Sequence, residues 1–217
     1  TVKNKLHNLT FPQQREEKPE KKAVELLYID ADEDHVPLQF KEKKGDLEVG
    51  ENNWKNNCVL AKLVYVYEGI EPESPKSKRH KLVNPHYFSG VYDGADNAKL
   101  WDEVYAYLDS HYDLKKVKKI YLNADGGTWI RSGKKRIAGI TSVLDEFHLQ
   151  KYLLKMTGHM KDSADDARKE LCDAIKSGIK SDFQEIVKRL KACAETESAE
   201  KRIEESGAYI LSNWTAA

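Results

Sequence analysis

The sequence lacks the features that would place a protein in a membrane or secreted class. No apolar run approaches the roughly 20 residues that a membrane helix needs, and the first residues show no apolar signal-peptide core. Cysteine is scarce: Cys58, Cys172 and Cys193 are far apart, odd in number and form no CxxC pair, so we expect them to be reduced and structural. We therefore expect a cytoplasmic protein without a membrane partner.

Net charge of one sign is also missing. The 36 Lys and Arg residues balance 36 Asp and Glu residues, so the whole-chain charge does not indicate nucleic-acid binding, and any such role must rest on local patches. The chain has 217 residues, enough for one ordinary domain plus a small insertion. Its composition, 40% apolar and 33% charged, is typical of a globular protein.

The first half of the chain reads as strands followed by a helix and another strand. Three strand-like segments cover residues 23–40, 57–70 and 80–94, and the first contains an acidic break before a second short extended piece. Residues 97–112 have helical spacing, and 115–125 lead into a short buried strand that can lie parallel to the first. Three antiparallel strands, a helix and a parallel strand predict an α/β fold with a ribonuclease-H-like mixed sheet.

The second half of the chain has helical spacing. We expect helices over residues 141–160, over 161–178 with Gly178 as C-cap, from Ser181 with Gln184 in capping-box spacing, and over 199–214.

These elements suggest four parts. Residues 1–20 would end an N-terminal region and linker, and 21–160 would be the ribonuclease-H-like core. Residues 161–206 exceed what that core requires, so we interpret them as an all-helical insertion. Residues 207–217 would begin a C-terminal core helix.

An acidic cluster ends the first predicted strand. Asp30, Asp32 and Asp34 alternate along the strand and so share one face, and His35 follows them. Three like charges on one face repel one another, and a divalent cation such as Mg²⁺ or Mn²⁺ is the usual reason to tolerate that repulsion. The alternative is a solvated acidic turn between two strands.

Two further features sit at later element boundaries. Asp125 follows an apolar strand and precedes two glycines, which is where α/β folds place their sites, although Asp-Gly is also an ordinary turn signal. Because the first and parallel strands are neighbours in the predicted order, Asp32 and Asp125 would be within reach of one metal pair. Asp145 and His148 are three apart on a predicted helix, so they share a face and could contact DNA, the metal site or each other.

Three motifs in order, followed by a fourth string, carry a family resemblance. The strings LYIDADEDHVPLQF, IYLNADGGTWI and VLDEFHLQKYL, followed by YILSNW, resemble the transposases of ISLre-type bacterial insertion sequences, which in turn resemble Mutator-like DDE transposases. The resemblance covers residues 20–160 and resumes at 209–214. It implies an acidic triad of two Asp and one Glu that binds Mg²⁺ or Mn²⁺, two ions in the complete enzyme, to cut and join DNA.

The resemblance also implies roles for individual residues. It places the second acid on Asp125 and the Asp-x-x-His motif on Asp145 and His148, and it favours Asp32 over Asp30 as the first acid. The family's third acid belongs to a motif beyond residue 217, so we expect this fragment alone to be inactive.

The remaining candidate residues would contact DNA or support the metal ligands. Asp34 and His35, like Asp145 and His148, would support the metal ligands or contact DNA. The expected partners are the transposon ends and the target DNA, with self-association of the full-length protein. One alternative to a transposase is a nuclease of the same fold that acts on RNA–DNA hybrids or DNA junctions, and another is a non-catalytic DNA-binding or assembly module. Candidates for contacts to the DNA backbone lie on a loop after Asp125: Arg131, Lys134, Lys135 and Arg136.

Overall fold

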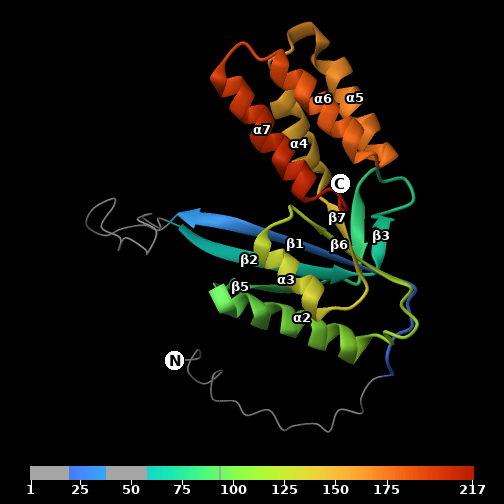
Figure 1. Ribbon diagram of the computed structural model, residues 1–217. Helices are drawn as coiled ribbons and strands as arrows, with labels where there is room; N and C mark the ends of the chain where they lie inside the picture. The colour runs from blue at the N-terminus through green and yellow to red at the C-terminus, as the bar shows by residue number, and fades with distance from the viewer. Residues whose placement is uncertain (1–19, 38–57, 93) are drawn as a thin grey trace.

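The computed structural model describes residues 20–37, 58–92 and 94–217. Within those ranges the protein is a mixed α/β structure with a five-stranded sheet, a two-stranded sheet and six α-helices (Figure 1). The predictions for residues 1–19 and 38–40 lie outside the described residues. None of the helices in the described ranges is long and apolar enough to cross a membrane.

The larger sheet has the strand order β5-β2-β1-β6-β7. β1 pairs antiparallel with β2, and β2 pairs antiparallel with β5. β6 lies parallel to β1 on its other side, and β7 lies parallel to β6. The predicted pairing of the first strand with the strand after the helix is therefore found. The strands are β1 (Leu26–Pro37), β2 (Cys58–Tyr67), β5 (His86–Val91), β6 (Lys119–Ala124) and β7 (Ile140–Leu144).

Two helices cover one face of this sheet, α2 (Asn97–His111) and α3 (Thr128–Arg136). Alternation along β1 places Leu27 and Ile29 on this face, where they are fully buried with Val64 and Val66 of β2. α2 contributes Leu100, Trp101, Val104 and Leu108, the apolar positions that its helical spacing predicts.

Tyrosines follow one another across the opposite face of the sheet. Neighbouring rings stack or tilt against each other with centroids 5.3 to 5.9 Å apart. Asp30 and Asp32 share this face, because the residue between them, Ala31, is buried in the core on the other side. The tyrosines are Tyr28, Tyr65, Tyr67, Tyr87 and Tyr121.

Four helices form a bundle beyond the β7 side of the sheet (Figure 1). They share a second apolar cluster that includes Leu153, Leu171, Phe183 and Ile203. The bundle helices are α4 (Glu146–Thr157), α5 (Ala164–Ser177), α6 (Lys180–Ala192) and α7 (Glu197–Ser212).

Residues 161–206 are helical, as their spacing predicts, apart from short connections. Gly178 closes α5 with a left-handed φ of 71°, which confirms the predicted C-cap. α7 continues through residue 206 without a break. Whether residues 161–206 are an insertion stays a prediction.

Two predicted helix starts are wrong. Residues 141–144 belong to β7, since this short segment with β-branched Ile140, Thr141 and Val143 pairs with β6, and the helix begins only after Asp145. Ser181 and Gln184 form no capping box, because Ile179 is the N-cap of α6 and its side chain makes no cap hydrogen bond.

Three other predictions need correction. β1 runs without a break through its acidic residues, so these lie within the strand and not in a turn after it. The predicted third strand is split at Asn84, which has a φ of 48°: β4 (His80–Val83) pairs with β3 (Gly69–Pro72) in a separate hairpin, and only β5 joins the sheet. The basic residues after Asp125 lie on α3, not on a loop. Two 3-10 turns, η1 (Gly94–Asp96) and η2 (Lys161–Ser163), complete the elements.

Candidate active site

The register between β1 and β6 brings the predicted acids together. Asp30 lies opposite Asn123 and Ala31 lies opposite Ala124, so Asp32 lies next to the position of Asp125, one residue past the end of β6. Neighbouring strands are about 4.8 Å apart, and residues in register on parallel strands point to the same face.

These residues line one pocket of about 310 Å³. Acids from three successive places contribute to it: β1, the end of β6 and the start of α4. The pocket therefore collects both first-acid candidates, the second-acid candidate and the predicted Asp-x-x-His pair. Its lining residues are Asp30, Ala31, Asp32, Tyr65, Asn123, Ala124, Asp125, Asp145, Phe147 and His148.

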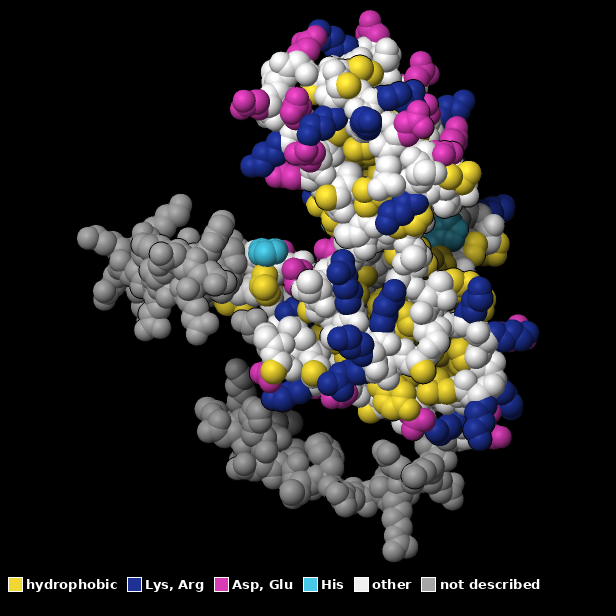
Figure 2. Space-filling model, in the orientation of Figure 1, with side chains coloured by type: hydrophobic (Ala, Val, Ile, Leu, Met, Phe, Trp, Pro, Cys, Tyr) yellow, Lys and Arg dark blue, Asp and Glu magenta, His cyan; other side chains and the backbone are white. Residues whose placement is uncertain are grey.

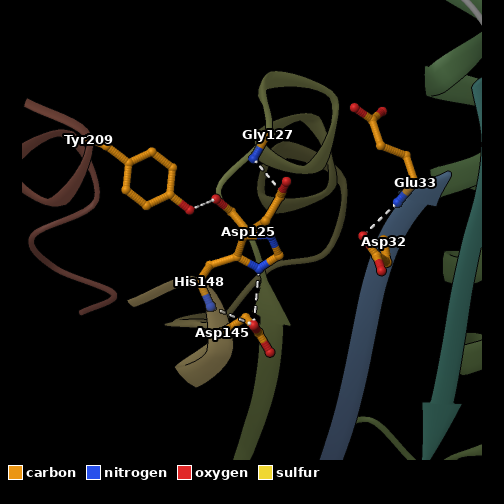
Figure 3. A network of polar contacts seen from close by, with 7 residues as sticks. All are labelled: Asp32, Glu33, Asp125, Gly127, Asp145, His148 and Tyr209. Atoms are coloured by element: carbon orange, nitrogen blue, oxygen red, sulfur yellow. Dashed lines mark hydrogen bonds and ion pairs between the residues drawn. The ribbon is translucent and has the colours of Figure 1, made fainter. Parts of the chain in front are cut away.

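Asp125 is held in a tight turn. The backbone N–H of Gly127 donates to Asp125 Oδ1 at 2.9 Å, and Gly126 between them has a φ of 84°, which a side chain would disfavour. From the bundle, the Tyr209 hydroxyl donates to the backbone carbonyl of Asp125 (Figure 3). The carboxylate and the carbonyl of this residue therefore each have a defined donor.

Asp145 and His148 contact each other at the start of α4. Asp145 is the N-cap and not a residue within the helix, but the two residues contact each other, which is one of the predicted alternatives: Asp145 Oδ1 accepts from the His148 backbone N–H at 3.0 Å. His148 Nδ1 lies 3.0 Å from the same oxygen (Figure 3). The Asp145 backbone N–H donates to Ala124 O at 3.0 Å, which ties this pair to the end of β6.

The two first-acid candidates have different surroundings. Asp32 is exposed, and its Oδ1 accepts from the Glu33 backbone N–H at 2.8 Å. Asp30 is half-buried beside Tyr67, whose hydroxyl is 3.3 Å from Asp30 Oδ1. Burial raises the pKa of Asp30 and the nearby Asp145 carboxylate adds to that rise, against hydrogen bonds from Tyr65, Asn123 and Tyr67 that lower it.

Asp34 and His35 are not brought to this pocket. Both are exposed further along β1, where His35 Nε2 lies 4.0 Å from Glu33 Oε1. Asp34 instead lines a neighbouring hollow with Lys62 and Val91.

The predicted DNA-backbone cations lie on α3, over which Lys and Arg side chains gather (Figure 2). Arg136 forms an ion pair with Asp102 of α2. Arg131, Lys134 and Lys135 form no ion pair with any described residue, and the first two line a second pocket of about 290 Å³ together with Asn213. Three of the four cations are therefore available to an anionic partner.

Sequence reasoning missed several residues of the site. Asn123 and Tyr65 face the pocket with the acids, and strand alternation around Asp125 could have indicated Asn123. Tyr209 belongs to the YILSNW string, but no local signal shows that its hydroxyl reaches Asp125. Among the residues that the structure describes, no three His, Cys, Asp or Glu side chains gather closely enough to hold a metal ion.

The chain matches one protein family. The profile described as Uncharacterised protein family (UPF0236) matches residues 3–217. A UPF0236 protein of Caldanaerobacter subterraneus subsp. tengcongensis is 35% identical over 214 residues, which are 99% of this chain and 39% of that protein. A second UPF0236 protein of that organism is also 35% identical over 214 residues, which are 41% of its length, and its name joins eleven locus designations.

A more distant relative comes from another genus. A "UPF0236 protein in vanSb 3'region" of Streptococcus gallolyticus is 26% identical over 202 residues, 91% of this chain and 39% of that protein. The chain thus spans about two fifths of the length of these curated relatives. No solved structure matches it.

Proposed function

The chain belongs to the UPF0236 family, and we propose that it is part of a metal-dependent DNA transposase whose catalytic pocket is the one formed by β1, β6 and α4. The function would be cleavage of DNA strands and their transfer to a target. Because the chain covers about two fifths of its relatives, the activity is proposed for the full-length protein.

One observation carries the proposal: four carboxylates line a single pocket whose lining includes no Lys or Arg. Asp30 and Asp32 come from β1, whereas Asp125 follows β6 and Asp145 precedes α4. His148 is paired with Asp145, and no Lys or Arg in that lining offsets the mutual repulsion of the carboxylates. A bound divalent cation would remove this repulsion, and carboxylate oxygens are the ligands that Mg²⁺ and Mn²⁺ prefer.

The donor set fits Mg²⁺ in its usual mode of binding. Mg²⁺ keeps several waters and is often held by one or two carboxylates together with substrate phosphates, so a tight cage of three side chains is not required. Asp32 and Asp125 would hold the ions, with Asp30 beside them. The ions would supply activation of the attacking oxygen and neutralise charge on the phosphate.

The chain's own residues would orient this site. Gly127 fixes the Asp125 carboxylate through its backbone N–H. Asp145 contacts His148 at Nδ1, and a protonated His148 would donate from Nε2 to a DNA phosphate. The unpaired cations of α3 would contact the DNA backbone beside the cut.

Two further observations support a transposase. The sheet has an antiparallel ladder of β2 and β5 on one side of β1 and the parallel strands β6 and β7 on the other, which is the order expected of a ribonuclease-H-like core. The name of one relative joins eleven locus designations, and a gene at many loci is expected when the gene spreads through its genome.

Metal binding is the first test. We expect Mn²⁺ to raise the unfolding temperature of this chain by about 2–4 °C, the shift that a stabilisation of about 1 kcal/mol gives a protein of this size. The double substitution Asp32→Asn and Asp125→Asn should abolish the shift. Asp34→Asn, a matched change outside the pocket, should leave it intact. A shift that survives the double substitution would contradict the metal assignment, and no shift in the parent chain would favour a non-catalytic module.

Strand cleavage is the second test. We expect the full-length protein to cut DNA that carries the element's own ends when Mg²⁺ or Mn²⁺ is present, and this chain alone to be inactive. Cleavage by the full-length protein that survives Asp125→Asn would contradict the proposed role of that residue. Cleavage by this chain, lost on Glu204→Gln or Glu205→Gln, would instead place the third acid on α7.

A further inference from the structure

The end of α7 lies against the turn that carries Asp125. Tyr209, in the last turn of α7, donates its hydroxyl to the Asp125 carbonyl. The same turn orients the carboxylate through the N–H of Gly127. A contact to the backbone of this turn therefore acts on a side chain in the pocket (Figure 3).

Asn213, one helical turn after Tyr209, fills the space beside Gly126. Asn213 is buried, and its Oδ1 lies 2.4 Å from where a Cβ on Gly126 would stand, so no side chain fits at 126 while Asn213 keeps this place. Asn213 Nδ2 donates to Tyr209 O at 3.0 Å and to Ser212 Oγ at 3.3 Å. The helix end thus holds Asn213 in the position where it limits movement of the turn.

The bundle packs against Tyr209 and against Trp214, the residue that follows Asn213. The Tyr209 ring stacks on Tyr152 of α4 with centroids 3.8 Å apart, and Trp214 packs against Phe183 of α6 at 5.3 Å.

We propose that Tyr209 and Asn213 are positioning residues for Asp125, through which the helical bundle fixes the carboxylate that holds metal in the pocket. The inference rests on the proposed function. It assigns a role to the YILSNW string and to the bundle. Asp145, at the start of the bundle, is the one acid that the bundle contributes to the pocket. A shift of the end of α7 would nevertheless change metal binding there, because it would move the turn that carries Asp125.

Mn²⁺ affinity of this chain, measured by electron paramagnetic resonance titration, tests the proposal. Tyr209→Phe removes only the hydroxyl and keeps the stacked ring. We expect roughly tenfold weaker Mn²⁺ binding, the effect typical of losing a partner that orients a metal ligand. Two matched controls, Tyr152→Phe in the same stack and Tyr105→Phe on the exposed side of α2, should bind Mn²⁺ as the parent chain does.

A metal-free measurement separates positioning from a loss of stability. In Tyr209→Phe, hydrogen exchange at the Gly127 amide should become faster, because its acceptor is less well fixed, while amides in the α2–sheet core keep their protection. Equal Mn²⁺ affinity and equal Gly127 exchange in Tyr209→Phe and the parent chain would overturn the positioning role alone. Failure of the parent chain to bind Mn²⁺ would overturn the proposed metal site, and faster Gly127 exchange would then still identify Tyr209 as the clamp of this turn.

Discussion

Asp30 combines two demands that oppose each other at the scale of one residue. It lies half-buried on the tyrosine face of the sheet, where losing contact with water disfavours its charged form. It also lines the pocket in which a charged carboxylate would bind a cation. A residue of this kind lowers the stability of the metal-free protein at neutral pH.

The Asp30→Asn substitution tests this cost. Because the folded-state pKa is raised above the ordinary 3.8, the folded state keeps a proton that the unfolded state has lost, so stability falls as pH rises from about 3.8 through the folded-state pKa. Asparagine does not titrate. We expect the unfolding temperature of Asp30→Asn, relative to the parent chain, to improve by about 1–2 °C between pH 3.5 and pH 7 in the absence of metal. If the unfolding temperature of Asp30→Asn instead falls relative to the parent chain as pH rises, the hydrogen bonds to Asp30 lower its pKa by more than burial raises it.

Gly133 lies at a position where its surroundings leave no room for a side chain. It lies under Trp101, and a Cβ at this position would be 2.7 Å from ring atoms Cδ2 and Cε2 of that fully buried side chain. Trp101 has little room to move, since its Nε1 donates to Trp129 O at 2.9 Å.

We expect Gly133→Ala to lower the free energy of unfolding. The substitution gains about 1 kcal/mol of helix propensity, whereas overpacking costs about 1–3 kcal/mol, so the net loss should reach about 2 kcal/mol. Urea titration followed by circular dichroism measures it. Gly69→Ala, where a Cβ meets nothing within 4 Å, is the control and should change little. A more stable Gly133→Ala protein would mean that α3 can shift away from Trp101.

At the scale of elements, strong periodicity and end signals predicted β2, α2 and the Gly178 cap. β7 was missed because its five residues are contiguous with the helical pattern of α4, and only its pairing with β6 reveals a strand. The split third strand depends on Asn84 adopting a positive φ, which local sequence does not determine. The basic cluster after Asp125 was found, but its helical conformation was not.

If the cations of α3 contact the DNA backbone, they should contribute to the salt dependence of DNA binding. We expect replacement of Arg131, Lys134 and Lys135 by Gln to reduce the slope of log affinity against log salt for duplex DNA by about 3, one for each lost phosphate contact. Lys169, Lys176 and Lys188 are exposed on the bundle, and the same replacement there is the control. Equal changes in the two triple variants would show that α3 has no special role. Fluorescence anisotropy at several salt concentrations measures both slopes.

At the scale of the whole molecule, the sequence indicated the acids but not what holds them. Carboxylates that directly follow an apolar run of a strand can be recognised from hydrophobic pattern, and strand order then places Asp32 beside Asp125. The contacts of Tyr209 and Asn213 with the Asp125 turn join residues more than 80 positions apart, and no local pattern encodes them. No local pattern encodes the ion pair of Arg136 with Asp102 either, whose partners are 34 positions apart.

The parallel pairing of β1 with β6 also sets how the chain must fold. Each paired residue on β6 lies 93 positions after its partner on β1, as Leu26 and Lys119 do. A loop of that length must close before the pairing can form, and contacts of such separation slow folding because the entropy of closure is lost before the contacts form. A cation in the proposed site could not gather Asp32 and Asp125 early, since these two residues are as far apart in the chain as the strands themselves. The pocket therefore forms no sooner than the centre of the sheet, and the proposed metal binding should return during refolding only after β1 has paired with β6.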